Sequence, residues 1–335
     1  MISARPRPSY PGLVVALAVA ASAATLASVA VGYSRLDLWE AVADLARGDG
    51  TLPALVLVEL RLPRALLGLL VGCSLGLAGA AMQGLLRNPL AEPGIVGISG
   101  AAAFGAVLVF YSGLAGATSL ALPLGGIAGA AAATLLLFGL AGRGAGTTTL
   151  ILAGVAVNAF AGAATALALN LSPNPYAALE IVFWLMGSLA DRSMAHVWLI
   201  LPLMSAGWVL LLLAGPALDA LSLGEDTAAS LGFGLGRLRI QIVAGAALSV
   251  GSAVAVTGAI GFVGLVVPHL LRPFAEGRPG RLLLPSMLGG GVLTLAADLG
   301  IRLVGVRPEL KLGVVTAILG APFLFHLIWR LRRSG

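Results

Sequence analysis

Long apolar stretches separated by short polar segments make up most of the chain. Ten of these stretches carry few or no charged residues: 11–33, 65–86, 93–112, 118–142, 147–169, 193–215, 238–257, 259–272, 282–304 and 310–329. A helix that spans the hydrocarbon core of a membrane needs about 20 predominantly apolar residues. The pattern therefore predicts an all-α polytopic membrane protein with about ten transmembrane helices. The third and the eighth stretch are short and rich in glycine.

The basic residues indicate one orientation of these spans. Ten spans place both termini on the same side, and that side then carries more Lys and Arg than the other, including Arg5, Arg7 and Arg143. Cytoplasmic loops of membrane proteins hold an excess of Lys and Arg. We therefore expect both termini in the cytosol, a single transmembrane domain over 1–335 with its spans within about 11–330, and a cytosolic polar segment at 219–237.

Composition excludes several other classes of protein. Hydrophobic residues make up 59% and charged residues 10% of the 335 positions, whereas a soluble protein carries about 25% charged residues. The apolar stretches are far longer than the roughly 10 alternating residues of a membrane β-strand, which argues against a barrel. The net charge of +6 does not indicate a nucleic-acid partner, because the basic residues are scattered between the spans.

Residues with catalytic or ligand-binding chemistry are sparse. The single cysteine, Cys73, allows no disulfide, and no group of His, Cys and carboxylate residues has the spacing of a metal site. The only lysine, Lys311, is followed by leucine, so the ending of a phosphate-binding loop is absent. We expect no catalytic residue, no metal and no cofactor. If the protein moves a solute uphill, the energy must come from another subunit or from an ion gradient.

Two glycine triplets, GIVGISG (94–100) and GAIGFVG (258–264), each follow a long span and open a short one. The two would run in opposite directions across the membrane, as in an inverted repeat of spans two to five and seven to ten. With 46 glycines in the chain, about one such triplet is also expected by chance.

The segment LSLGEDTAASLGFGLGRLR (221–239) is a polar island between two apolar stretches. Ser222 and Glu225 have the spacing of a capping box, and the short helix that they predict is followed by a glycine. Its small apolar face consists of Ala228, Ala229 and Leu231. From the residues alone, this helix either lies in the membrane interface or contacts another subunit.

Arg61 and Arg64 stand three residues apart at the predicted outer mouth of the second span. Such arginines can snorkel to the membrane surface, or they can form a fixed cationic site for carboxylates of a partner. Asp298 is the sole carboxylate near the interior of the predicted spans, and Arg302, four residues later, is its simplest partner.

Six blocks of the sequence, in the same order, resemble the signature of the FecCD family, the permeases of the iron-siderophore, haem and cobalamin ABC importers. The blocks are RLPR (61–64), MQGLLRNPLAEPGIVGISGA (82–101), FWLMGSL (183–189), LGEDTAASLG (223–232), GAIGFVGLVVPHLLR (258–272) and GVVTAILGAPFLFHLI (313–328). The match covers roughly residues 58 to 330. It implies that 1–335 is one permease domain in the cell inner membrane, with substrate entering from the periplasm or cell exterior.

The resemblance also implies partners and cargo. Two permease copies, expected here as a homodimer, enclose a central path. Two ATP-binding subunits bind on the cytosolic side, and a periplasmic or lipid-anchored substrate-binding protein docks outside. ATP hydrolysis then resides in a partner, so this chain is not an enzyme. Ferric siderophore is the expected cargo on family frequency, with haem or cobalamin as alternatives. A secondary transporter driven by an ion gradient is the alternative from another class, although the spans hold almost no carboxylates to carry ions.

Three sets of functional residues follow from the resemblance. The coupling segment, which contacts the ATP-binding subunit, comprises Gly224, Glu225, Asp226, Ala228, Ala229, Leu231 and Gly232. The residues expected to dock the binding protein are Arg61, Arg64 and Arg307. The family pattern near Arg307 has proline where this chain has Lys311, and Arg302 could take the place of Arg307. The cytosolic end of the path is expected at Asn88, Leu90, Thr147 and Thr148.

Overall fold

The computed structural model describes residues 9–32, 36–142, 146–172 and 175–334. Arg5, Arg7 and Arg143, which entered the prediction of orientation, lie outside these residues. Within the described residues all regular secondary structure is helical, as the apolar pattern predicts.

The helices follow one another as long apolar rods joined by short segments. Their bounds are α1 (Tyr10–Ala30), α2 (Leu38–Arg47), α3 (Leu52–Leu55), η1 (Val56–Arg61), α4 (Leu62–Leu86), η2 (Pro93–Val96), α5 (Ile98–Tyr111), η3 (Leu114–Gly116), α6 (Ala121–Ala141), α7 (Thr147–Asn170), α8 (Pro175–Leu185), α9 (Met194–Leu213), α10 (Gly215–Ser222), α11 (Glu225–Ser230), α12 (Leu235–Ala246), η4 (Ala247–Gly251), α13 (Ser252–Thr257), α14 (Val263–Leu271), η5 (Arg272–Phe274), α15 (Pro279–Val304) and α16 (Leu312–Ser334).

Each of the ten predicted apolar stretches contains helix. Among the described residues, seven helical stretches are long and apolar enough to cross a membrane. The predicted stretches 93–112, 259–272 and 310–329 form shorter apolar helices. The molecule is thus an all-helical protein with several candidate spans, while the number of spans and the side of the termini stay predictions.

The second predicted span begins earlier than expected. Helix α3, the π-helical turn η1 and α4 continue one another from Leu52 to Leu86, whereas the apolar pattern predicted 65–86. Thr51 caps the start, because its hydroxyl oxygen accepts a hydrogen bond from the Ala54 N–H at 3.5 Å. Pro53 lies in the first turn, where its missing N–H has no helical partner to lose.

Helices α2 and α8 lie wholly outside the predicted apolar stretches. Helix α2 is amphipathic, and the Asp37 carboxylate caps it by accepting hydrogen bonds from the Trp39 and Glu40 N–H groups at 2.9 and 3.2 Å. Helix α8 is apolar but has only 11 residues. Neither reaches the length of a span, so a search for stretches of about 20 apolar residues misses both.

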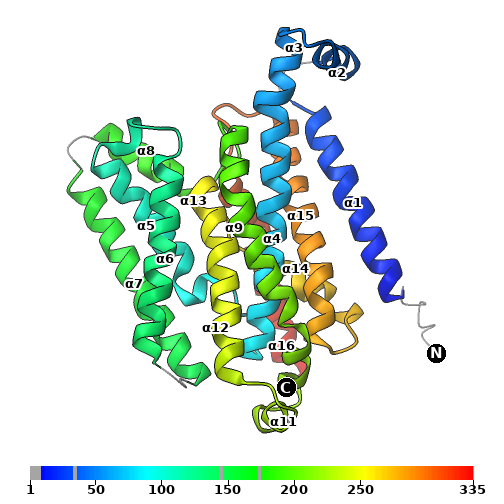
Figure 1. Ribbon diagram of the computed structural model, residues 1–335, viewed down its shortest axis with the longest axis vertical. Coiled ribbons are helices and arrows are strands. Elements are labelled where there is room, and N and C mark those ends of the chain that lie inside the picture. Colours follow the sequence, from blue (N-terminus) through cyan, green and yellow to red (C-terminus); the bar gives the residue numbers. More distant parts are fainter. Residues whose placement is uncertain (1–8, 33–35, 143–145, 173–174, 335) are drawn as a thin grey trace.

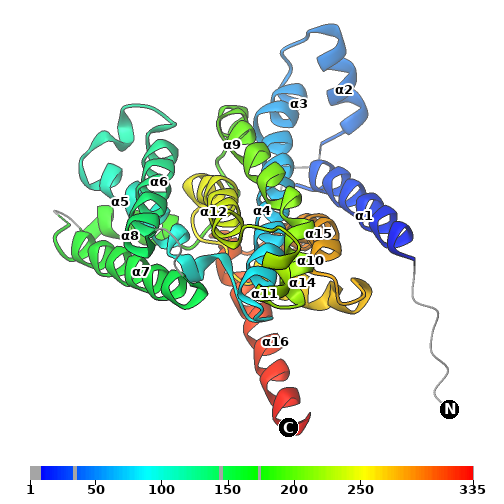
Figure 2. The ribbon, with the colours of Figure 1, turned by 60° about the horizontal axis from the view of Figure 1, so that its bottom comes forward.

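Helix α4 lies at the centre of the molecule and packs along α15 (Figure 1). A Cβ atom on Gly76 would lie 2.0 Å from the Ser286 carbonyl oxygen, and one on Gly290 would lie 2.1 Å from the Gly72 carbonyl oxygen. Small residues let membrane helices associate through their backbones where lipid supplies no hydrophobic drive. The other helices surround this pair, with α1 on one side and the group α5 to α8 on the other (Figure 2).

Both glycine triplets lie at breaks between helices. The first break lies between η2 and α5, where Gly97 has a φ of 77°. The second lies between α13 and α14, where Gly258 has a φ of 72° and Phe262 one of 67°. Glu92 connects the two breaks, because its Oε1 accepts a hydrogen bond from the Phe262 N–H at 3.0 Å. The inverted repeat itself stays a prediction.

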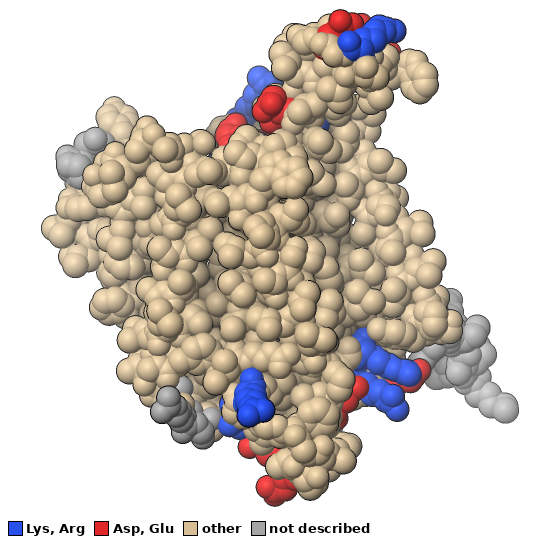
Figure 3. Space-filling view, viewed as in Figure 1, with Lys and Arg blue, Asp and Glu red and all other residues tan. Residues whose placement is uncertain are grey.

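One face of the molecule has two charged ends and an uncharged middle. The start of α1, the end of α16 and the short helix α11 lie at one end of the bundle (Figure 1). We call it the α11 end. On the face shown in Figure 3, the charged side chains gather toward the two ends and leave a broad uncharged belt between them. A surface of this kind suits the hydrocarbon core of a bilayer, where exposed charges are expensive.

Candidate functional site

The polar island forms two helices rather than one. Helices α10 and α11 are separated by Leu223 and Gly224, and Gly224 has a φ of 118°. The predicted capping box between Ser222 and Glu225 is wrong. Ser222 is the last residue of α10, and its hydroxyl donates back to the Asp219 carbonyl oxygen at 2.6 Å. The N-cap of α11 is therefore Gly224, without a side-chain hydrogen bond.

Helix α11 ends in a Schellman motif. The Gly232 N–H donates to the Ala229 carbonyl at 3.0 Å, and the Phe233 N–H donates to the Ala228 carbonyl at 3.1 Å. Gly232 has a φ of 87°, a left-handed conformation that favours glycine. The glycine that follows the helix thus stops it, as the sequence predicts.

The two alanines of α11 face opposite ways. Ala228 is fully buried, whereas Ala229 is exposed. Leu223 and Leu231, at either end of the helix, are 68% and 60% exposed. The exposed residues of this segment include Leu223, Asp226, Ala229 and Leu231, whereas Ala228 is not accessible to a partner.

Two polar contacts fasten this segment to the long helices. The Asp219 Oδ1 accepts a hydrogen bond at 2.7 Å from the Gly280 N–H, in the first turn of α15, where the helix dipole favours a carboxylate. The two carboxylate oxygens of Glu225 lie 3.1 and 3.2 Å from Nη2 of Arg239, which projects from α12. The first contact fixes α10 to α15, and the second fixes α11 to α12.

Arg61 is buried at the opposite end of the bundle and holds the end of α1. Its Nη1 donates to the Ala30 carbonyl at 2.6 Å and to the Val29 carbonyl at 3.1 Å, and the residue is 5% exposed. The last carbonyl groups of a helix have no partner within the helix. Arg61 supplies one, so its guanidinium is occupied inside the chain.

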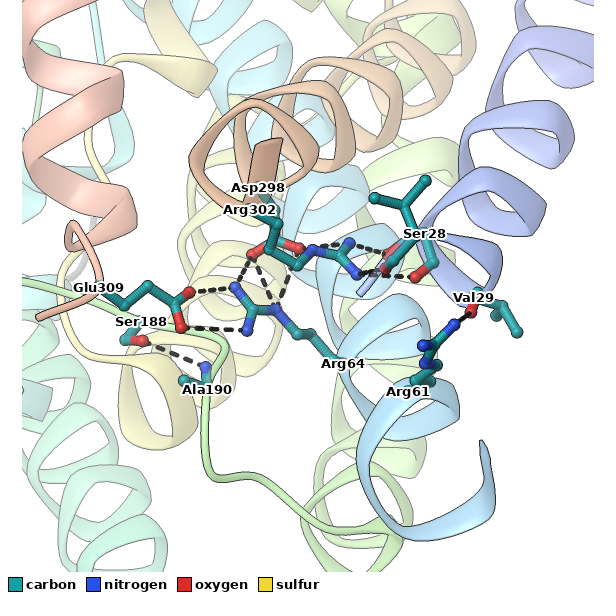
Figure 4. A network of polar contacts seen from close by, with 10 residues as sticks. Ser28, Val29, Arg61, Arg64, Ser188, Ala190, Asp298, Arg302 and Glu309 are labelled. Carbon is teal, nitrogen blue, oxygen red and sulfur yellow. Dashed lines mark hydrogen bonds and ion pairs between the residues drawn. The ribbon is translucent and has the colours of Figure 1, made fainter. Parts of the chain in front are cut away.

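Arg64, Asp298, Arg302 and Glu309 form a cluster of ion pairs between α4, α15 and the segment before α16 (Figure 4). Nη2 of Arg64 lies 2.7 Å from Oδ1 of Asp298, and Nη2 of Arg302 lies 2.8 Å from Oδ2 of the same residue. The predicted pairing of Asp298 with Arg302 is thus confirmed. Arg64 also pairs with Glu309. Two cations and two anions balance in this cluster, as buried charges require.

Of the arginines expected at the docking surface, Arg307 is the exposed one. It lies between α15 and α16, and no ion pair of its side chain occurs in the described part of the chain. Arg302 is 7% exposed and donates to Ser28 of α1, so its charge does not reach the surface. The docking roles of Arg61, Arg64 and Arg307 stay predictions, and for the first two a partner would have to displace internal contacts.

The predicted path residues follow α4 and begin α7. Asn88 and Leu90 form a turn in which the Asn88 Oδ1 accepts a hydrogen bond from the Leu90 N–H at 2.9 Å. Thr147 and Thr148 are the first residues of α7, and Thr148 is exposed. Helix α4 ends and α7 begins at the α11 end of the bundle (Figure 1). Their place in a translocation path stays a prediction.

This arrangement of helices has counterparts among known proteins. A solved structure described as a metal-chelate type ABC transporter in an inward-facing conformation superposes on the chain with a TM-score of 0.83 at 29% identity. The superposition covers 96% of this chain and 99% of the other. The sequence profile of the FecCD transport family matches residues 19–330. The chain belongs to the FecCD transport family.

Relatives in the FecCD family are named for three kinds of cargo. The vitamin B12 import system permease protein of Vibrio cholerae is 44% identical over 280 residues, which are 82% of each chain. The ferric enterobactin transport system permease protein of Escherichia coli is 37% identical over 333 residues, with 98% of this chain and 96% of the relative covered. The hemin transport system permease protein of Yersinia pestis is 36% identical over 295 residues, with 83% and 85% covered. These identities do not separate the kinds of cargo.

Four charged residues that fix elements of this FecCD chain were not predicted from the sequence: Glu92, Asp219, Arg239 and Glu309. All four are charged residues near the ends of apolar stretches, where a charge is a candidate for a specific role. This position in the sequence is the signal that could have identified them. Their partners could not be named in the same way. The partners of Glu92 and Asp219 are backbone N–H groups 170 and 61 residues away.

Proposed function

We propose that this chain is the permease subunit of an ABC importer that carries a ferric siderophore from the periplasm or cell exterior into the cytosol, across the cell inner membrane. Hydrolysis of ATP on two separate ATP-binding subunits drives the transport. The sequence has no phosphate-binding loop of its own, which fits this division of labour. Relatives named for ferric enterobactin, hemin and vitamin B12 support cargo of the metal-chelate kind. Haem and cobalamin are the alternatives to the siderophore.

The observation that carries the proposal is the geometry of the coupling segment, Gly224 to Gly232. Its exposed face is small and carries Ala229 beside Asp226 and Leu231. Glu225 holds the segment to α12, and Asp219 holds the preceding helix α10 to α15. A short rigid helix of this kind suits a groove on an ATP-binding subunit, because it converts movement of that subunit into movement of the attached spans.

Two further partners complete the importer. A periplasmic or lipid-anchored substrate-binding protein docks at the end opposite α11, where Arg307 offers an exposed positive charge to an acidic residue. A second copy of the chain completes the translocation path, whose cytosolic end lies at Asn88, Leu90, Thr147 and Thr148.

A secondary transporter driven by an ion gradient fits the structure less well. Such a protein needs a carboxylate that can exchange a proton or a sodium ion near the middle of the membrane. The sequence offers Asp298, and both of its oxygens are held by arginines, Arg64 and Arg302. A transported ion would have to displace a guanidinium from this buried cluster.

Uptake into proteoliposomes tests the proposal. The vesicles contain the permease, its ATP-binding subunit and its binding protein, and a ferric siderophore, haem and cobalamin are offered in parallel. We expect accumulation of one of them with ATP, and none with a proton or sodium gradient alone. Uptake by the permease alone on an ion gradient would overturn the proposal.

The coupling segment is tested by Ala229→Arg. This substitution places a long charged side chain on the exposed face, so we expect ATP-driven uptake to fall more than tenfold while the amount of membrane-inserted chain is unchanged. Ala229→Ser is the matched control, because it keeps a small side chain and should retain uptake. Normal binding of the ATP-binding subunit and normal uptake in Ala229→Arg would contradict the assignment.

A further inference from the structure

A cavity at the α11 end is lined by three arginines. It has a volume of about 260 Å³ and lies where α4 ends, α15 begins and α10 passes beside them. Arg87 directly follows α4, Arg272 begins η5 and Arg278 directly precedes α15. The cavity is separate from the exposed face of α11, but Ser222 at the end of α10 forms part of its wall.

In the part of the chain that the structure describes, no carboxylate pairs with these arginines. Within the described ranges, none of the six ion pairs involves Arg87, Arg272 or Arg278. Arg272 donates to the Oε1 of the buried Gln83 at 2.6 Å, which fixes its guanidinium at the cavity wall. The acidic residues of the adjoining segments are engaged elsewhere.

Those acidic residues are Asp219 of α10 and Glu276 of the segment between η5 and α15. The Asp219 Oδ1 accepts the hydrogen bond from the Gly280 N–H at 2.7 Å. Glu276 pairs with Arg281, whose guanidinium also lies 5.4 Å from the centre of the Tyr10 ring. The cavity therefore keeps three positive charges whose counter-charge must come from outside the chain.

The position of the cavity indicates the source of that counter-charge. It lies at the level where α4 and α14 end and α15 begins, which is the level of lipid headgroups if the α11 end is cytosolic. Part of its wall is apolar, with Ala80, Ala275 and Leu282 beside the guanidinium groups. Basic pockets between membrane helices on the cytoplasmic side bind the headgroups of anionic phospholipids.

We propose that this cavity binds the phosphate group of an anionic phospholipid of the inner leaflet. The phosphate accepts charge-assisted hydrogen bonds from Arg87, Arg272 and Arg278, and the acyl chains lie against the apolar surface of the neighbouring helices. A phosphate held there links the end of α4 to the start of α15, directly beside α10. Occupancy therefore stiffens the support of the coupling segment, a consequence that rests on the proposed function, whereas the binding itself does not.

Binding is tested with the full-length permease in a neutral detergent. Native mass spectrometry measures the dissociation constants of dioleoyl phosphatidylglycerol and dioleoyl phosphatidylcholine, and thermal unfolding in 10 mM inorganic phosphate is the third arm. Each arginine near a membrane surface contributes about fivefold to the affinity for an anionic lipid. We expect phosphatidylglycerol to bind more tightly than phosphatidylcholine, and Arg87→Gln/Arg278→Gln to weaken its binding about 30-fold.

Both substituted residues are exposed, so the double variant should fold normally. The matched control is Arg47→Gln/Arg237→Gln, which removes the same charge from exposed arginines outside the cavity and should bind the lipid within twofold of the wild type. Inorganic phosphate could stabilise the wild type as much as phosphatidylglycerol does, and the cavity variant could lose this stabilisation. The cavity would then be a phosphate site for a soluble ligand, and the lipid assignment would be wrong. Unchanged lipid and phosphate binding in the cavity variant would overturn the proposal. So would unchanged lipid binding together with loss of the ATP-binding subunit, because the cavity would then be a protein-docking surface.

Discussion

Arg64 shows how one residue can fit two roles that a sequence does not separate. In the structure it is 12% exposed in its side chain and pairs with both Asp298 and Glu309. We expect Arg64→Gln to lower the stability by about 3 kcal/mol, because it removes the ion pair of Glu309 and leaves the buried Asp298 with Arg302 alone. Thermal and denaturant unfolding in detergent measure the loss. Arg307→Gln, which removes an exposed charge, should stay within about 0.5 kcal/mol of the wild type.

The same pair of residues separates folding from docking. Arg307→Glu should weaken the binding of the substrate-binding protein to the permease. The effect should be larger at low salt, because salt screens the interaction between exposed charges. An unchanged unfolding temperature in Arg64→Gln would show that its ion pairs do not hold the fold. Arg64 would then return to the docking surface, as the sequence predicted.

Glu92 gives a prediction with a defined dependence on pH. Burial raises the pKa of its carboxyl above the usual value, and the hydrogen bond from the Phe262 N–H opposes the rise. When the pKa of a carboxyl is higher in the folded than in the unfolded chain, its stabilisation is complete below the unfolded value, about 4.3, and is lost as the pH rises through the folded value. Glu92→Gln keeps the acceptor oxygen and removes the charge. The unfolding temperature of the variant should therefore gain on that of the wild type as the pH rises from about 4 to 8. A gain of the wild type over the variant would mean that the ionised carboxylate is the form that holds α14.

At the scale of helices, the contact between α4 and α15 depends on glycine. A Cβ atom on Gly290 would lie 2.1 Å from the Gly72 carbonyl oxygen, so Gly290→Ala must push the two helices apart. Gly300, ten residues along the same helix, has no heavy atom within 4 Å of such a Cβ atom. We expect Gly290→Ala to lower the unfolding temperature clearly, whereas Gly300→Ala stays neutral or gains up to about 1 kcal/mol of helix propensity. Equal effects of the two substitutions would show that the helices are not held by this close approach.

The apolar pattern was sufficient for the helices whose length a bilayer dictates. Each predicted stretch contains a helix because about 20 apolar residues have few alternatives in a membrane. It failed for α2 and α8, whose form depends on caps and local packing, and for the start of α3, where Thr51 caps a helix that runs on through charged residues. Asp37 with Glu40 three residues later was a visible start signal for α2.

The candidate sites were predictable only where the partners are close in sequence. Asp298 and Arg302 lie on one turn of α15, and helical spacing alone predicted their pairing. The partner of Arg64 lies 245 residues away in Glu309, and tertiary packing alone brings them together. For the same reason the capping box at Ser222 was wrong. Ser222 and Glu225 have the spacing of a capping box, but Ser222 lies in the last turn of α10 and its hydroxyl donates to a carbonyl oxygen of that helix.

The arrangement of the whole molecule bears on where a substrate can pass. Of the most apolar part of α4 and the segment before it, 89% is buried inside the molecule. The corresponding buried share is 28% for α6 and for α7, and 11% for α1. A path through the middle of one copy would have to pass through α4. We therefore expect a passage for a large chelate on an outer face of the chain, closed by a second surface. Closed symmetric pairs are the commonest way for a protein to supply such a surface.

We therefore expect the working permease to contain two copies of this 33.5 kDa chain related by a two-fold axis along the path. Native mass spectrometry of the detergent-solubilised permease, without its partner subunits, should give twice the mass of one chain. Cross-linking then locates the axis. Cys73 is the only cysteine and is buried in α4, so a single added cysteine reports on its own position. Thr148→Cys, at the start of α7, should be joined to its counterpart by a short thiol cross-linker. Leu26→Cys, on the exposed face of the peripheral helix α1, should not.

A fully active monomer would refute the pair. Cross-linking through Leu26→Cys but not Thr148→Cys would move the path to the side of α1, away from the residues that the sequence predicted for its cytosolic end.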